Sequence, residues 1–188
     1  MATPEQLRDA LLTPEEAAEM DAPGRTDAAV LVPLYLDGGE LHAVFTKRRD
    51  DLSRHAGEIS FPGGRQDFPD EDLRLTALRE AHEEIGLPPD EVELVGALPP
   101  TPTIVTGYRI HPFVGVIKPG HDWTPQPTEV DAILELSLPD VRAGYEMKRL
   151  VRKGVPFKSV TYTVDENLIW GATARIVQQL LDRLSSLL

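Results

Sequence analysis

The sequence predicts a single α+β domain, an α/β/α sandwich in which helices cover both faces of a mixed central β-sheet. Several apolar, strand-like runs are separated by loops that contain Pro or Gly, and they are interrupted by one central and one terminal helical segment. The chain has 188 residues, of which 41% are hydrophobic and 27% are charged, which is typical of a folded globular protein with a real core.

The first elements are expected to be helical, and a hairpin follows them. Residues 3–20 contain two Pro-Glu pairs ahead of Leu and Ala, which indicates one or two short helices. Residues 21–27 read as a linker, and residues 28–36 and 41–46 read as two strands joined by a tight Asp-Gly-Gly turn. We therefore divide the chain into an N-terminal extension, 1–26, and a main domain, 27–188.

The main domain continues with a short strand, a glycine turn and the central helix. The strand covers 58–61, the turn covers Pro62-Gly63-Gly64, and the helix ends at Gly86. The apolar face of this helix is expected to hold Leu75, Leu78, Ala81, His82 and Ile85. The later strands are expected at 92–98, 110–117, 132–138 and 157–164, and an amphipathic helix begins at Gly171.

Charge and composition exclude several classes of function. A net charge of -12 argues against a nucleic-acid-binding surface, which needs clustered cations. The longest apolar run, 28–36, is interrupted by Pro33 and is far too short to span a bilayer, so no membrane partner is expected. There is no cysteine and no visible secretory signal, and a cytoplasmic location is expected.

Three acids lie at helical spacing in the central helix. Glu80, Glu83 and Glu84 fall on one side of a helical turn with no cation between them, although like charges at this spacing cost about 0.2–0.5 kcal/mol per pair. A solvated helix face is the alternative to a ligand site. Carboxylates suit Mg²⁺ or Mn²⁺, which often join carboxylates to phosphate, so the sequence predicts metal-assisted phosphate chemistry.

The glycine turn and the start of the helix complete this block. Gly63 and Gly64 allow close approach to a ligand, and an exposed carbonyl there could join the carboxylates around a cation. Asp70 or Glu71 could hold the guanidinium of Arg79, and the spacing does not choose between them.

The segment from Gly57 to Leu87 resembles the Nudix box, which reads Gly, five residues, Glu, seven residues, Arg-Glu-aliphatic-any-Glu-Glu-any-Gly-aliphatic. The residues that match its second half are Arg79, Glu80, Ala81, Glu83, Glu84, Gly86 and Leu87. Seven residues separate Glu71 from Arg79, as the box requires, but six residues instead of five separate Gly64 from Glu71.

The flanking segments are similar to the coenzyme A pyrophosphatase branch of that family. The residues that carry this similarity are Thr46, Arg48, Leu52, His55, Gly57, Glu58, Phe61, Pro62, Gly63, Gly64 and the run Ile169-Trp170-Gly171-Ala172-Thr173-Ala174. The longer loop is also found in members of that branch. The resemblance implies a Nudix fold, a divalent cation, and cleavage of coenzyme A into 3',5'-ADP and 4'-phosphopantetheine.

The resemblance also suggests roles for individual residues. Glu80, Glu83 and Glu84 would hold Mg²⁺ or Mn²⁺ with the Gly63 carbonyl, and Gly64 would lie against the substrate. The general base would be a box acid or a loop acid such as Glu129. Arg48 and His55 would hold the nucleotide phosphates, with a structural role in the preceding turn as the alternative for His55.

Two other functions are compatible with the sequence. A Nudix enzyme could act on another nucleoside diphosphate compound, such as ADP-ribose, NADH or an oxidised nucleotide, because loops decide what binds. A non-catalytic nucleotide-binding module is a different class, but such a module is expected to lose box carboxylates that this chain keeps. A homodimer is suggested by the family, although the apolar stripe of the closing helix is equally compatible with packing inside one chain.

Overall fold

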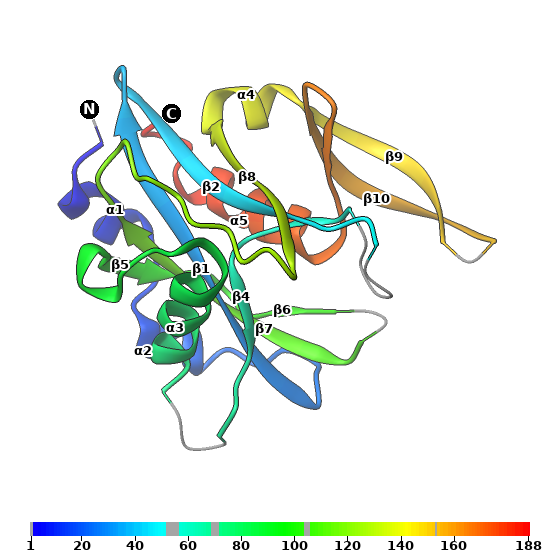
Figure 1. Cartoon of the computed structure of the whole chain (residues 1–188), viewed down its shortest axis with the longest axis horizontal. Coiled ribbons are helices and arrows are strands. Elements are labelled where there is room, and N and C mark those ends of the chain that lie inside the picture. The colour runs from blue at the N-terminus through cyan, green and yellow to red at the C-terminus, as the bar shows by residue number, and fades with distance from the viewer. Residues whose placement is uncertain (1, 52–56, 69–71, 104–105, 153) are drawn as a thin grey trace.

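The structure is a computed structural model that describes residues 2–51, 57–68, 72–103, 106–152 and 154–188. Its centre is a sheet in the order β3-β2-β1-β7-β5, with β4 also paired to β1, β6 to β7 and β8 to β2 (Figure 1). The strands are β1 Thr26–Asp37, β2 Glu40–Arg48, β3 Ile59–Ser60, β4 Gly63–Arg65, β5 Glu93–Ala97, β6 Thr101–Pro102, β7 Tyr108–Val116 and β8 Val130–Ser137. The sheet is mixed because β1 and β7 are parallel and the other pairs are antiparallel.

Helices and a second, smaller sheet surround this layer. The helices are α1 Pro4–Ala10, α2 Pro14–Ala18, α3 Leu73–Ile85, α4 Leu138–Ala143 and α5 Gly171–Arg183, with a 3-10 turn at Pro89–Glu91. The smaller sheet has the order β11-β10-β9 and is built from β9 Tyr145–Arg152, β10 Val155–Val164 and β11 Asn167–Ile169. The hairpin of β9 and β10 projects from the body of the molecule (Figure 1).

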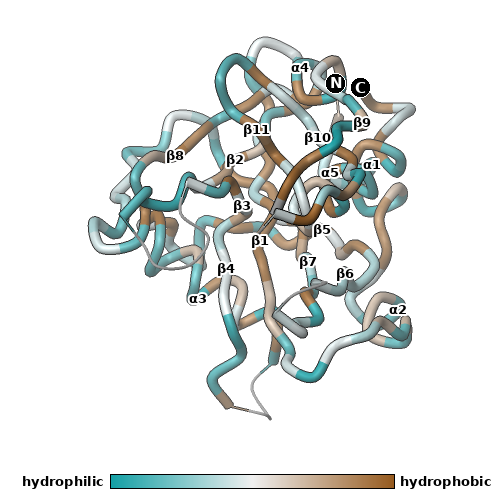
Figure 2. Tube along the Cα trace, turned by 90° about the vertical axis from the view of Figure 1, so that its right-hand side faces the viewer, coloured by the Kyte–Doolittle hydropathy of each residue, from teal (hydrophilic) through white to brown (hydrophobic). Residues whose placement is uncertain are grey.

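The central strand β1 is buried on both faces, and its side chains alternate between two cores. Val32 and Leu34 belong to the core shared with α1, α4 and α5, whereas Leu31 and Tyr35 belong to the core shared with α2 and α3. A near-continuous hydrophobic run is typical of a strand covered on both sides, and Figure 2 shows β1 as a mostly hydrophobic segment through the middle of the molecule. The predicted layered α+β architecture is confirmed.

Most of the predicted elements are present. The two short N-terminal helices, the 28–46 hairpin, the central helix and the closing helix are all found. The helices of the extension are not separate from the domain, because Leu7 and Leu11 are buried in the main core. The division of the chain at residue 26 stays a proposal. In the part of the chain that the structure describes, no helix is long and apolar enough to cross a membrane.

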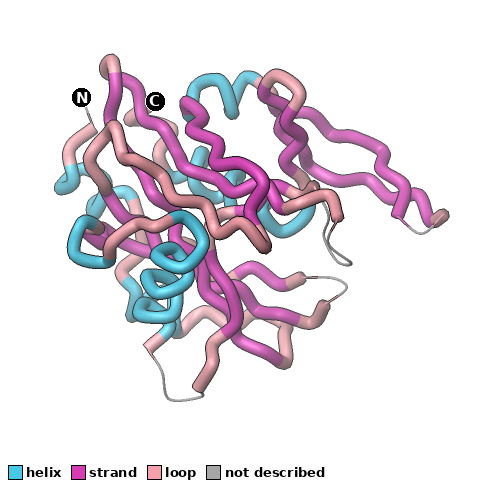
Figure 3. Tube along the Cα trace, viewed as in Figure 1, coloured by secondary structure: helices cyan, strands magenta, loops and turns pink. Residues whose placement is uncertain are grey.

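Three predictions about local structure were wrong. Gly63 and Gly64 lie in strand β4, paired with β1, and not in a turn. Leu75 and His82 are exposed, whereas Glu84 occupies the buried side of α3 beside Ala81 and Ile85. Helix α4 and strands β6, β9 and β11 were not predicted; Figure 3, which colours strands magenta, shows the long projecting hairpin to which β9 belongs.

Candidate active site

Helix α3 carries the acidic motif, and local signals set its two ends. Asp72 accepts a hydrogen bond from the Arg74 amide and is the N-cap. Gly86 ends the helix in the left-handed conformation, with φ +73°, which a residue without Cβ adopts at little cost. The helix packs against β1 and β4, and this packing brings its acids to the two glycines of β4.

Glu84 is a buried carboxylate at the centre of the site. Its residue is only 8% exposed, and its Oε2 accepts a hydrogen bond of 3.2 Å from the Gly63 amide. Burial raises the pKa of Glu84 to about 8, and the nearby charges of Glu80 and Glu129 raise it as well, while Arg48 and the Gly63 amide oppose the shift. The groups that act on Glu84 are therefore the residues that the sequence predicted for the site.

Glu80 lies directly against the backbone of Gly64. A Cβ atom on Gly64 would be 2.5 Å from the Glu80 carboxylate, closer than real Cβ contacts, so any other residue here would force the Glu80 side chain to move. Burial raises the pKa of Glu80, and a hydrogen bond from Arg79 opposes this effect. Gly63 is more strictly required, because its Cβ would overlap the Ala29 carbonyl oxygen of the paired strand, which is a backbone atom.

Arg79 connects two of the predicted ligands. One guanidinium nitrogen donates to Glu80 at 2.9 Å and to Glu83 at 3.3 Å, and the other lies 3.3 Å from Asp67. Glu83 has a side chain that is 55% exposed and points toward Arg79. Asp67 was not predicted, although the loop that exceeds the box length by one residue contains it.

The acids do not form a ready-made metal cage. Among the described residues, no group of three His, Asp or Glu side chains is placed so that it could hold a metal ion. Arg79 binds Glu80 and Glu83 instead. The predicted metal-binding role of Glu83 stays a prediction. Glu71, Asp70 and His55 lie outside the described residues.

Glu129 and Arg48 form the opposite side of the site. Their charged groups are 3.7 Å apart, and Arg48 lies at a β-bulge of β2 where the register with β8 shifts. The loop that leads to Glu129 is tied to the end of α3, because the Gln126 amide donates to the Glu84 carbonyl at 2.8 Å. The Arg49 amide also donates to the Glu129 carbonyl, at 3.1 Å.

A cavity of about 570 Å³ borders this side of the site, within the size range of ligand pockets. Arg48 and Glu58 line it from β2 and the segment before β3, and Phe157 and Lys158 line it from β10. The start of α5 supplies other lining residues, which are Trp170, Gly171, Ala172, Thr173 and Arg175. Two segments far apart in the sequence, around Arg48 and Trp170, thus share one cavity.

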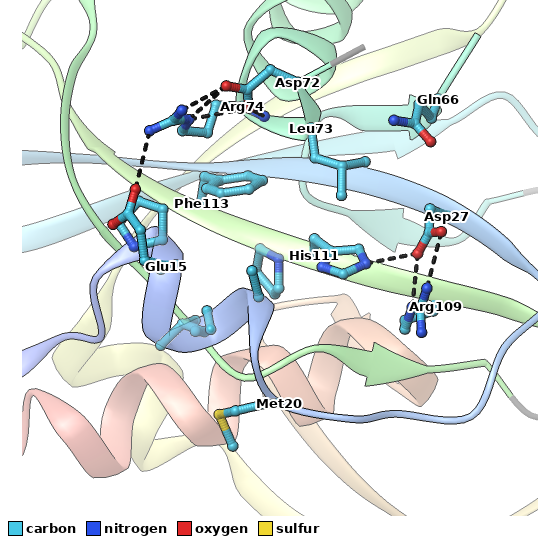
Figure 4. Close-up of a pocket in the computed structure, with 16 residues that line it drawn as sticks. Glu15, Met20, Asp27, Gln66, Asp72, Leu73, Arg74, Arg109, His111 and Phe113 are labelled. Carbon is cyan, nitrogen blue, oxygen red and sulfur yellow. Dashed lines mark hydrogen bonds and ion pairs between the residues drawn. The ribbon is translucent and has the colours of Figure 1, made fainter. Parts of the chain in front are cut away.

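A second cavity, of about 440 Å³, lies between α2, the start of α3 and β7 (Figure 4). Its charged groups are paired with one another: Asp27 accepts from Arg109 at 2.7 Å and contacts His111 at 2.8 Å. On the other side Arg74 pairs with Asp72. Among the described residues that line this cavity, each charged side chain is already paired with one of opposite charge, so the cavity offers no unpaired charge to a ligand.

The donor chemistry of the acidic site fits a hard divalent cation. Glu80 and Glu84 are oxygen donors held against Gly63 and Gly64, and burial disfavours the charged form of both in the absence of a cation. A divalent ion would compensate the charge that burial penalises. Glu80 and Glu84 are the residues that could hold it.

The fold and this motif define the class of protein. A family model described as the NUDIX domain matches residues 25–153, and the chain belongs to the Nudix family. It is a Nudix hydrolase, a pyrophosphatase of nucleoside diphosphate derivatives, and enzymes of this family generally need divalent metal ions.

Relatives in sequence agree with this assignment. The chain is 36% identical over 162 residues to a protein named "Uncharacterized Nudix hydrolase NudL" from Enterobacter sp. (strain 638), covering 85% of this chain and 83% of the relative. A protein of the same name from Salmonella newport is 37% identical over 155 residues, or 81% of this chain and 80% of the relative.

The fold is shared with more distant structures. The NUDIX domain of Shewanella oneidensis NrtR, complexed with ADP ribose, matches with a TM-score of 0.58 and 16% identity, covering 92% of this chain and 99% of that one. A C. elegans Ap4A hydrolase matches with a TM-score of 0.52 and 18% identity, covering 62% and 82%. At these identities the likeness concerns the fold.

Proposed function

We propose that this chain hydrolyses the diphosphate bond of coenzyme A or its acyl derivatives, giving 3',5'-ADP and 4'-phosphopantetheine or its acyl form. One observation carries the proposal. The two segments whose sequences are similar to the coenzyme A pyrophosphatase branch, around Arg48 and Trp170, line one cavity, and its lining residue Arg48 lies 3.7 Å from Glu129 of the acidic site. The chemistry that all Nudix enzymes share would not require the segment around Trp170 to line the same cavity as Arg48.

We assign different roles in the reaction to the carboxylates of α3 and to Arg48. A divalent cation held by Glu80 and Glu84, when bound, supplies positive charge to a diphosphate that otherwise repels nucleophiles. Arg48 offers a guanidinium to the phosphate oxygens, a geometry that favours paired hydrogen bonds. Its present partner is Glu129 at 3.7 Å, a long contact that a phosphate can replace.

Glu129 is the proposed general base. Its side chain is 51% exposed, so water can reach it, and the anchored loop holds it beside Arg48. Glu129 takes a proton from the attacking water, the water oxygen bonds to one phosphorus, and the bridging P–O bond breaks with its electrons on the leaving phosphate. Glu84 is less suited to this role, because its carboxylate is buried and hydrogen-bonded to Gly63.

Product analysis tests the proposal. We would incubate the full chain with Mg²⁺ or Mn²⁺ and coenzyme A, acetyl-coenzyme A, ADP-ribose, NADH or nucleoside triphosphates, and compare it with Glu84→Gln. Release of 3',5'-ADP from coenzyme A in preference to turnover of the others, lost in the variant, is the expected result. Preference for ADP-ribose or NADH would refute coenzyme A as the substrate. Absence of metal-dependent turnover of every compound would favour a non-catalytic module.

A further inference from the structure

The cavity beside Arg48 is lined unevenly by charge. Among its described lining residues Arg48, Lys158 and Arg175 are cationic, and Glu58 is the one acid. The chain as a whole carries a net charge of -12, so a cationic cavity wall is the reverse of what its average composition gives. Arg48 already has an acidic partner, Glu129, so it is the presence of Lys158 and Arg175 in this cavity that needs an explanation.

Arg175 is a partly buried cation that has no acidic partner among the residues that the structure describes. It projects from α5 and donates one hydrogen bond of 2.6 Å to the Pro102 carbonyl oxygen. Within the described ranges no carboxylate forms an ion pair with it, and burial alone lowers its pKa. A buried charge without a counter-ion is costly, and the remaining N–H groups of a guanidinium favour a phosphate or carboxylate.

Lys158 approaches the same cavity from the other wall. It belongs to β10, which forms the projecting hairpin with β9 (Figure 1). Lys158 is paired with Arg149 across this hairpin and is exposed. It forms no ion pair with a described carboxylate. The contrast with the cavity of Figure 4 is informative, because there Arg109 and Arg74 are each held by an aspartate.

We infer that Arg175 and Lys158 bind a second anionic group of the substrate, a phosphate monoester separate from the diphosphate that is cleaved. This inference rests on the proposed function, for which that group is the 3'-phosphate of coenzyme A. Phe157 and Trp170 lie in the same cavity, with ring centroids 6.2 Å apart, and offer apolar surface for the nucleoside that carries the phosphate. Both cations are specificity-determining residues, because neither belongs to the acidic site where the bond breaks.

Coenzyme A and dephospho-coenzyme A provide a matched pair of substrates that differ only in this phosphate. We expect Lys158→Ala and Arg175→Gln each to raise KM for coenzyme A about tenfold or more, the scale of one lost charge-assisted hydrogen bond, with kcat nearly unchanged. KM for dephospho-coenzyme A should change by less than about twofold. The control is Lys148→Ala, a lysine of the same hairpin whose Nζ contacts Glu146 at 3.3 Å outside the cavity.

A binding measurement separates failure of this inference from failure of the proposed function. Calorimetric titration in EDTA should show that the wild type binds 3',5'-ADP more tightly than AMP, and that both variants lose this preference. If coenzyme A is not hydrolysed but the preference is present, the phosphate site stands and the proposed function falls. Two results would overturn the inference. One is equal affinity of the wild type for 3',5'-ADP and AMP, and the other is an equal rise in KM for coenzyme A and dephospho-coenzyme A in the variants. Lys158 is exposed, so its variant tests the idea even if Arg175→Gln fails to fold.

Discussion

Substituting Glu84 by Gln should stabilise the metal-free protein at neutral and alkaline pH. The folded protein raises the pKa of this carboxyl from 4.5 to about 8, because burial disfavours the charge. Folding therefore favours the protonated form, and this contribution to stability is present in full below about pH 4.5 and is lost as the pH rises through about 8. Gln is neutral throughout and can still accept the hydrogen bond from Gly63.

The size of the effect follows from the same interval. At about 1.4 kcal/mol per pH unit above pH 4.5, the free energy of unfolding of the wild type falls by about 3 kcal/mol by pH 7 and by at most about 5 kcal/mol above pH 8. Urea unfolding in EDTA at pH 5, 7 and 9 measures this, and the midpoint of Glu84→Gln should exceed that of the wild type by about 1 M or more at pH 9. The two proteins should be nearly equal at pH 5.

The matched control is Glu83→Gln, which removes one charge from the same helix at a side chain that is 55% exposed. Its difference from the wild type should be within about 1 kcal/mol at every pH, as for other exposed ion pairs. If Glu84→Gln and the wild type lose equal stability between pH 5 and 9, the carboxyl is not held neutral by burial. As a separate expectation, adding Mg²⁺ in place of EDTA should stabilise the wild type and not Glu84→Gln, because only the wild type keeps both carboxylate donors.

Three further predictions concern other parts of the molecule. Gly64→Ala places a Cβ against the Glu80 carboxylate, so kcat should fall at least about tenfold while circular dichroism is unchanged, and wild-type activity would contradict the close approach. Glu129→Gln should lower kcat about 10²–10³-fold with little change in KM, and an unchanged kcat would exclude Glu129 as the base. Asp27→Asn should lower stability by about 1–3 kcal/mol near pH 7 in thermal melts, because Arg109 loses a charged partner. Arg109 lowers the pKa of Asp27, so this difference should fade below about pH 4, and a constant difference would contradict the ion pair.

The sequence predicted the architecture well where hydrophobic pattern alone decides it. Strand β1 follows from a near-continuous apolar run, and helix α5 follows from apolar residues at helical spacing. It predicted Glu80 and Glu84 for the site from their spacing. It could not predict that Glu84 is buried, because hydropathy assigns carboxylates to the surface, and so the apolar face of α3 was wrongly expected to include Leu75 and His82, which are exposed.

Other features depend on contacts that a pattern does not contain. Gly63 and Gly64 read as a turn, but they are strand residues chosen for close backbone approach to β1 and Glu80. Arg175 lies on a helix whose amphipathic pattern is complete without it. The available signal was its place near the start of that helix, where the helix dipole disfavours a cation.

Glu84 contributes its side chain to one part of the site and its backbone to another. Its carboxylate faces Gly63, while its carbonyl oxygen accepts the amide of Gln126 and so sets the start of the segment that ends at Glu129. The buried carboxylate and the proposed base are thereby positioned by the same residue, and the two residues between Gln126 and Glu129 act as a fixed spacer. A residue inserted near Gly120, ahead of this anchor, can be absorbed by the preceding loop, whereas one inserted after Gln126 would move Glu129 away from Arg48 without disturbing the helix.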